Sequence, residues 1–190
     1  MVFMMKDLSQ NVENLRNEMI VFLTEMCRIR AIAPESGGDG EVERASFVLM
    51  QLSRLGFNNV EVIEAKDARV SAGYRPNIIV TLPGSDKKLP PVWVITHLDI
   101  VPEGDRGLWK TDPYDPVLKK GLLIGRGVED NGQSLTASLF AAKALKDSGD
   151  KQPRTVKVAF VADEEVGSKF GIQFLVEKGL FGKRDLLLVP

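Results

Sequence analysis

The sequence predicts an α/β protein built as a three-layer αβα sandwich, with helices on both faces of a mostly parallel, mixed sheet. Short runs rich in Val and Ile alternate along the 190-residue chain with longer segments of helical periodicity. Several of these runs show no polar alternation, which is typical of strands buried on both faces. A content of 44% hydrophobic and 27% charged residues fits one soluble globular domain of this length.

The first half of the chain contains two helical segments followed by strands. Residues 8–32 carry apolar side chains at helical spacing, which predicts one amphipathic helix. Turn-forming residues fill positions 33–40, and a second helix is predicted over residues 41–55, with Gly56 as its C-cap. Runs rich in β-branched residues then predict strands at residues 60–63, 77–82 and 92–96.

The second half begins with a long loop, residues 100–116, interrupted by prolines and glycines. Long ordered loops are often functional. The pattern then predicts a hairpin over residues 117–124, a helix over 132–146, a strand over 156–161, a helix over 170–178 and a strand over 185–189.

Charge and cysteine content exclude several classes of partner. With 25 basic and 26 acidic residues, the chain has no general electrostatic reason to bind nucleic acid or an anionic membrane. No segment approaches the ~20 apolar residues of a membrane span. The single cysteine, Cys27, lies on the apolar face of a predicted helix, which excludes a disulfide framework and fits a reducing compartment. We therefore expect a cytoplasmic protein without nucleic-acid or membrane partners.

Three stretches that could carry chemistry follow apolar runs. The only histidine of the chain, His97, ends the predicted strand 92–96, and Asp99 lies two residues further on. Asp130 follows the predicted hairpin, and Glu164 with Glu165 follows the strand 156–161. Functional sites in open α/β sheets lie beyond the carboxyl ends of the strands, so these side chains are expected to meet at one edge of the sheet.

The residue types indicate a metal-dependent hydrolytic site. Zinc prefers imidazole nitrogen and carboxylate oxygen, so His97, Asp130 and Glu165 are the candidate ligands. Two ions roughly 3.5–4 Å apart can share a bridging carboxylate, a role that suits Asp130. Glu164 is the candidate general base, because a carboxylate beside the metals can take the proton of the attacking water. Asp99 is expected to accept the second ring N–H of His97.

Other readings of these residues stay open at this point. A histidine at a strand end is often structural, and paired acids before a helix are often N-terminal caps. Gly125-Arg126-Gly127 is too short for a dinucleotide-binding fingerprint, and the aromatic residues of the long loop are expected to pack that loop. A non-catalytic α/β binding module is the alternative function.

Four motifs together resemble the M20 family of co-catalytic metallopeptidases, which includes acetylornithine deacetylase, succinyl-diaminopimelate desuccinylase, aminoacylase and glutamate carboxypeptidase. The motifs are HLDIVP (97–102), Trp109 with DPYDP (112–116), GRGVEDNGQ (125–133) and ADEEVGS (162–168). The resemblance implies the same residue roles. It also implies two Zn²⁺ ions, or Co²⁺ or Mn²⁺, and hydrolysis of an amide bond in a small peptide or N-acyl amino acid. For the full-length parent it implies a homodimer.

Two departures from the family pattern matter. Family members commonly carry a lysine and then a glycine after the bridging aspartate, where this chain has Asn131-Gly132-Gln133. The family's next acidic ligand, its final histidine ligand and its inserted dimerisation or lid domain would all lie beyond Pro190. Residues 1–190 are therefore expected to be the N-terminal portion of a catalytic domain. By itself this portion, an incomplete zinc-peptidase-like fold, is expected to be inactive. A degenerate, non-catalytic family member is the alternative.

Overall fold

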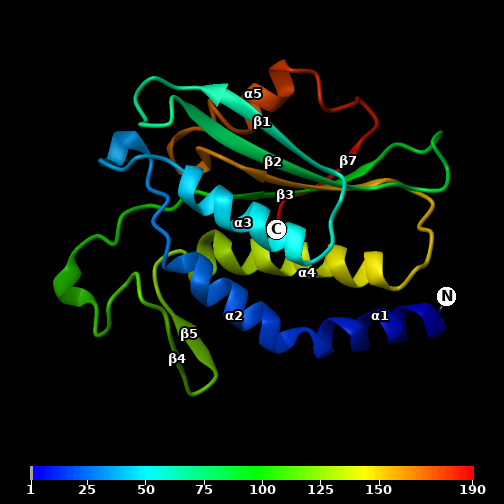
Figure 1. Ribbon diagram of the computed structural model, residues 1–190, viewed down its shortest axis with the longest axis horizontal. Coiled ribbons are helices and arrows are strands. Elements are labelled where there is room, and N and C mark those ends of the chain that lie inside the picture. The colour runs from blue at the N-terminus through cyan, green and yellow to red at the C-terminus, as the bar shows by residue number, and fades with distance from the viewer. Residues whose placement is uncertain (1) are drawn as a thin grey trace.

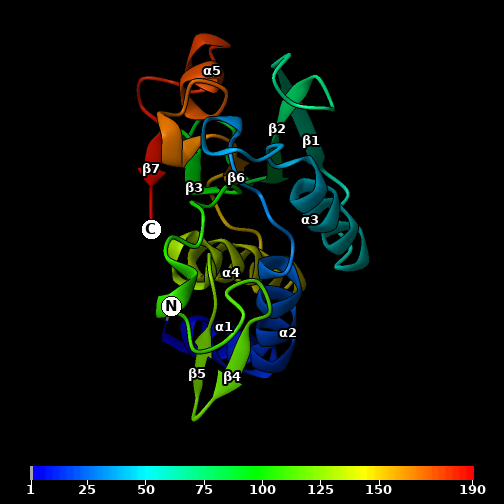
Figure 2. The ribbon, with the colours of Figure 1, turned by 90° about the vertical axis from the view of Figure 1, so that its left-hand side faces the viewer.

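A computed structural model describes the backbone of residues 2–190 and the side chains from residue 8 onward, and it is organised around one mixed sheet. The strand order is β1-β2-β6-β3-β7 (Figures 1 and 2, with all five strands labelled in Figure 2). The β1–β2 and β2–β6 pairs are antiparallel, whereas β6–β3 and β3–β7 are parallel, so β3, β6 and β7 end at the same edge. The strands are β1 (Val60–Lys66), β2 (Tyr74–Leu82), β3 (Val92–His97), β6 (Val156–Val161) and β7 (Leu186–Leu188).

Helices cover both faces of this sheet, as the sequence predicts. Helices α3 and α4 contact one face, α1 and α2 lie outside α4, and α5 lies on the opposite face (Figures 1 and 2). Their bounds are α1 (Val2–Asn14), α2 (Arg16–Cys27), α3 (Val42–Arg54), α4 (Ser134–Asp147) and α5 (Ile172–Glu177). Within the described residues, no helix is both long and apolar enough to cross a membrane.

Alternating side chains of the strands build two cores, one on each face. Ile78 and Val80 of β2 join the larger cluster beneath α2, α3 and α4, while Ile79 joins the smaller cluster beneath α5. Trp93 is fully buried in the smaller cluster and donates its indole N–H to the Asp185 carboxylate at 2.9 Å. Each fully buried apolar side chain stabilises the fold by about 1.5–3 kcal/mol. The cores on both faces therefore stabilise the sheet, including the edge where β3, β6 and β7 end.

The prediction of one helix over residues 8–32 is wrong. The chain forms α1, which begins at Val2, and α2, which ends at Cys27, with Leu15 between them. The Leu15 N–H donates to the Val12 carbonyl at 3.0 Å, a tight turn that ends the first helix. Both helices contact α4, and this tertiary packing is not encoded in the local periodicity.

The predicted hairpin forms, but it stands apart from the main sheet. Strands β4 (Val117–Lys119) and β5 (Leu122–Ile124) pair with each other and project away from the body of the molecule (Figure 1). Lys120 and Gly121, at the turn, have φ values of 52° and 80°. Positive φ at both central residues matches the twist of a two-residue hairpin loop.

Cys27 is fully buried where α2 meets the turn that follows the hairpin. Its thiol donates to the carbonyl oxygen of Gly127 at 3.4 Å. Burial disfavours the thiolate and raises the pKa of Cys27 to about 11, more than the nearby Arg44 charge lowers it. The thiol therefore behaves as a small buried side chain.

We predict that Cys27 of the native protein resists a thiol-specific reagent at pH 8, because both burial and its raised pKa suppress the reactive thiolate. The same protein in denaturant should react completely, which provides the control. Absorbance of the released chromophore measures the reaction. Stoichiometric labelling of the folded protein as fast as that of the unfolded chain would contradict this placement of α2.

Candidate metal centre

The candidate site lies at the edge where the parallel strands end. In the register of β3 and β6, His97 is paired with Val161, so the residues after the two strands emerge side by side. His97, Asp130 and Glu165 each offer one ligand atom, and these atoms lie within 4.8 Å of one another. The structure therefore brings together the three side chains that the sequence analysis selected as ligands.

The imidazole of His97 is held between two sets of oxygens. Its Nδ1 lies 3.0 Å from the carbonyl oxygen of Asp99 and 3.4 Å from the Asp99 carboxylate. Its Nε2 lies 3.0 Å from Asp130 Oδ1 and 3.8 Å from Glu164 Oε2. If Nδ1–H donates to Asp99, the lone pair of Nε2 points to the acidic cluster, which is the arrangement that a metal-ligating histidine requires.

Asp99 joins the end of β3 to the acidic turn after β6. Its carboxylate is completely buried and accepts the backbone N–H groups of Glu164 and Glu165, each at 3.0 Å. Asp99 was also predicted from the sequence to accept the second ring N–H of His97. In the structure the Asp99 carbonyl is the nearer acceptor of the ring, and the carboxylate positions the two glutamates.

Asp130 comes from an irregular turn that precedes α4. The turn spans Val128–Gln133, and Asp130 within it has an extended conformation, which is why α4 starts at Ser134 rather than at the predicted residue 132. The Asn131 side-chain oxygen accepts the His97 backbone N–H at 3.3 Å, which ties the turn to β3. A Cβ on Gly132 would lie 2.3 Å from the carbonyl oxygen of Gly127, so this turn requires glycine.

The three acids after β6 separate into two groups. Asp163 is buried and its carboxylate faces away from the site, accepting the Phe170 N–H at 3.1 Å. The Glu164 side chain is 52% exposed and lies beside His97, whereas Glu165 is partly buried within the ligand cluster. Two neighbouring glutamates therefore have different surroundings, as different chemical roles require.

The charges of the cluster strongly bias its protonation. Burial lowers the pKa of His97, but the Asp99 carboxylate and, more weakly, Glu164 stabilise the imidazolium and raise the pKa to about 9. The pKa of Glu165 is also raised, first by burial and then by the charge of Asp130. The carboxylates around this imidazole repel one another, and a divalent cation bound among them would neutralise their negative charge.

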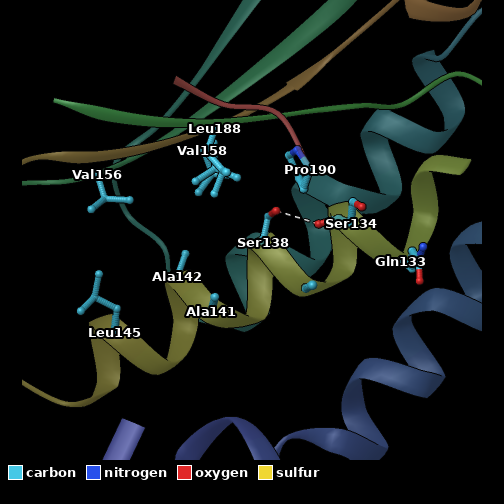
Figure 3. Close-up of a pocket in the computed structure, with 12 residues that line it drawn as sticks. Gln133, Ser134, Ser138, Ala141, Ala142, Leu145, Val156, Val158, Leu188 and Pro190 are labelled. Carbon is cyan, nitrogen blue, oxygen red and sulfur yellow. Dashed lines mark hydrogen bonds between the residues drawn. The ribbon is translucent and has the colours of Figure 1, made fainter. Parts of the chain in front are cut away.

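A groove away from the ligand cluster has no side chains suited to catalysis. It runs between α4 and strands β3, β6 and β7, and small residues of α4 line one side of it (Figure 3). Ser138 donates its hydroxyl to the Ser134 carbonyl at 2.7 Å, so that hydroxyl is already satisfied. None of the residues that line the groove carries a titratable side chain, and the metal-ligand cluster is therefore the better candidate for catalysis.

Several polar residues that support the site were not predicted. Arg44 of α3 is buried and donates to the carbonyl oxygens of Ile29 and Leu98, at 3.0 Å in each case. Asn131, Glu41 and Arg75 support it from other elements. Arg44, Glu41 and Arg75 are single polar residues in segments without a motif, so no spacing in the sequence marks them as part of a site. Asn131 lies in the motif at 125–133, but its bond to the His97 backbone depends on the folded turn.

Comparison with known proteins assigns the family. The sequence pattern described as "Peptidase family M20/M25/M40" matches residues 93–188, which contain all three candidate ligands. The chain belongs to peptidase family M20/M25/M40. The resemblance seen in the four motifs is thus confirmed, and so is the α/β fold class, because solved M20 peptidases superpose on this sheet and its helices.

Relatives of this M20 chain include proteins named as a metallohydrolase and as a metallodipeptidase. It is 37% identical over 185 residues to an uncharacterized metallohydrolase of Methanocaldococcus jannaschii, covering 93% of this chain and 44% of that relative. It is 28% identical to the Cys-Gly metallodipeptidase of Saccharomyces cerevisiae, over 84% of this chain and 34% of the relative. This M20 chain therefore spans less than half the length of these curated relatives.

Solved structures share the fold of the M20 chain. The di-peptidase structure from Saccharomyces cerevisiae superposes with a TM-score of 0.78 at 23% identity, over 97% of this chain and 40% of that one. Human carnosine dipeptidase 1 superposes with a TM-score of 0.73 at 26% identity, again over 97% of this chain and 40% of that one. M20 metallohydrolases hydrolyse peptide or amide bonds with divalent metals, and the ligand cluster fits that chemistry.

We predict that the His97 ring in the chelator-treated protein titrates at about pH 9. Because its pKa lies above the ordinary 6.5, the imidazolium stabilises the fold fully below pH 6.5, and this contribution is lost as the pH rises towards 9. As the chain has one histidine, a single ring resonance in a proton NMR titration reports the pKa directly.

The variant Asp99→Asn should move that pKa of His97 towards 6.5, because Asp99 supplies the largest stabilisation of the imidazolium. Glu164→Gln is the matched control and should lower the pKa less, since Glu164 is half-exposed and lies 3.8 Å from Nε2. An unshifted pKa in Asp99→Asn would show that the Asp99 charge does not govern the ring.

Proposed function

We propose that this chain is the part of a metal-dependent hydrolase that binds the metal and activates water for cleavage of an amide bond. The observation that carries the proposal is the convergence of His97, Asp130 and Glu165 at one sheet edge. One imidazole nitrogen and two carboxylate oxygens match the donors that Zn²⁺ prefers, and Co²⁺ or Mn²⁺ would accept the same donors.

In the proposed site His97 and Glu165 would each hold one ion of a two-metal centre, and Asp130 would be shared between the two ions. Asp130 suits this role because its carboxylate is 63% exposed and lies within 4.8 Å of the ligand atoms of both His97 and Glu165. Bound divalent ions supply Lewis-acid polarisation of the substrate carbonyl and lower the pKa of water. Asp99 keeps the His97 ring oriented and at the same time fixes the backbone that carries Glu165.

Glu164 is the proposed general base. Its carboxylate is half-exposed and lies beside the ligands. Among the described hydrogen bonds, no backbone N–H donates to this carboxylate, so it is free to accept a proton from the attacking water. Glu164 would take one proton from the attacking water and later return it to the nitrogen of the leaving amine. Proton transfer by a positioned side chain typically increases the reaction rate by about 10²–10⁴-fold.

The proposed substrates are small peptides or N-acyl amino acids. Relatives named as a Cys-Gly metallodipeptidase and as aminoacylase-1 support this class. The whole protein is proposed to act as a homodimer in the cytoplasm, and the single buried thiol of Cys27 fits a reducing compartment. Residues 1–190 are proposed to form the N-terminal portion of its catalytic domain, and this portion alone is proposed to be inactive.

Removal of a ligand should abolish metal binding. His97→Asn, Asp130→Asn and Glu165→Gln should each weaken Zn²⁺ binding by more than about 100-fold, the upper range for loss of a supporting residue at a metal site. Titration calorimetry of the metal-free chain measures the affinity. Because each of the two proposed ions would have only two protein ligands among the described residues, with Asp130 shared, we expect weak or partial occupancy by the 190-residue chain.

Glu129→Gln is the control for these ligand variants, because Glu129 is exposed, neighbours Asp130 and stands outside the ligand cluster. The Zn²⁺ affinity of Glu129→Gln should equal that of the unchanged protein. Equal weakening in Glu129→Gln would indicate a diffuse charge effect, and tight binding of two Zn²⁺ ions by residues 1–190 would contradict the expected occupancy.

Glu164→Gln should separate proton transfer from metal binding. In the longest polypeptide that the reading frame encodes, kcat for a dipeptide or N-acetyl amino acid should fall by about 10²–10⁴-fold, with metal content unchanged. Product amine is measured by derivatisation, and metal content by mass spectrometry. Unchanged turnover in Glu164→Gln would overturn its role, and a metal-free, inactive polypeptide would overturn the proposed function.

A further inference from the structure

The start of strand β2 carries two buried polar side chains, Arg75 and Asn77, to which the proposed function gives no role. The β2–β6 ladder stops at the pair Ile78–Phe160, so the two strands no longer exchange backbone hydrogen bonds beyond that point. Two side chains of β2, Asn77 and Arg75, continue the connection. They are two residues apart on one strand and therefore share a face of the sheet.

Asn77 replaces the missing ladder bonds with its side-chain amide. Its oxygen accepts the N–H of Ala162 at 3.1 Å, and its nitrogen donates to the carbonyl of Phe170 at 2.9 Å. Asn77 is fully buried, so both bonds are shielded from water. The segment from Ala162 to Phe170, which contains the two glutamates of the site, is thereby fastened at both of its ends.

Arg75 acts one step further along the same segment, through Glu41. The guanidinium forms a two-bond pair with the Glu41 carboxylate, in which Nε lies 2.5 Å from Oε2 and Nη2 contacts Oε1. Glu41 Oε1 accepts the backbone N–H of Asp163 at 3.3 Å, and Arg75 Nη1 lies 3.3 Å from the Asp163 carboxylate. The side chains of Arg75, Glu41 and Asp163 are at most 2% exposed.

The buried ion cluster of Arg75, Glu41 and Asp163 contacts the backbone at Asp163, which has an unfavourable conformation. Asp163 has φ 66° and ψ 20°, in the left-handed region that residues other than glycine rarely adopt. The next two backbone N–H groups are those of Glu164 and Glu165, which donate to Asp99. The acidic turn is therefore held from one side by Asp99 and from the other by the Arg75–Glu41 pair.

We infer that Arg75 and Glu41 are positioning residues for the metal site: their buried pair fixes the Asp163 backbone and thereby aims Glu164 and Glu165 at His97 and Asp130. The inference rests on the proposed function for its link to catalysis. A buried ion pair is often no more stabilising than apolar packing, so its geometric role is the better reason for its presence here. Gly40 admits the arginine, because a Cβ there would lie 3.0 Å from Arg75 Nε.

The test uses Arg75→Lys, which keeps the charge but loses the planar two-bond fork. Amide hydrogen exchange, followed by NMR in the chelator-treated chain, should become about tenfold faster at Glu164 and Glu165, while the central amides of β2 change less. Zn²⁺ affinity should fall by about 10–100-fold, as expected for a residue that supports a ligand. Glu41→Gln should change both readouts in the same direction.

Val48→Ala is the matched control, because Val48 is fully buried on α3, the helix that Glu41 precedes, and belongs to the larger apolar core. It should lower the free energy of unfolding without selectively accelerating exchange at the acidic turn or weakening Zn²⁺ binding. Exchange at Glu164 and Glu165 that is unchanged in both Arg75→Lys and Glu41→Gln would overturn the inference. If the longest polypeptide that the reading frame encodes also binds no Zn²⁺ when unmutated, the proposed function is overturned, and local acceleration in Arg75→Lys would still support the positioning of the acidic turn.

Discussion

The site depends on one buried carboxylate that bridges two strand ends. Asp99 follows β3 and accepts the backbone N–H groups of Glu164 and Glu165, which follow β6. Because the same residue also faces the ring of His97, a shift of either strand end moves the histidine and the glutamates together. A buried, charged acceptor with two N–H donors forms strong hydrogen bonds, so this contact sets the positions of His97, Glu164 and Glu165 relative to one another.

Buried arginines complete the surroundings of that carboxylate. Arg44 from α3 donates to the Leu98 carbonyl, between His97 and Asp99, and Arg75 from β2 faces Asp163 and Glu41. Both arginines are buried. Their positive charges balance part of the negative charge of the acidic edge, and the remaining negative charge suits an edge that receives a cation.

Local pattern was sufficient for most of the elements because burial on both faces produces unbroken apolar runs. The strand over residues 156–161 was predicted with its observed bounds, and α3 within one residue at each end. The break between α1 and α2 and the late start of α4 were missed. Both depend on contacts between distant segments, such as the packing of α1 and α2 on α4, which local periodicity does not contain.

The sequence by itself determined the fold class and the chemical types at the site, since a unique histidine and acids at strand ends restrict the possible ligands. It also indicated that Glu164 and Glu165 would differ. Tertiary structure alone decided which atoms meet: the Asp99 carboxylate bonds the glutamate backbone, and Arg75 reaches the same turn through Glu41. Those contacts join residues that lie 34 to 122 positions apart, and only the packed sheet brings them within hydrogen-bonding distance.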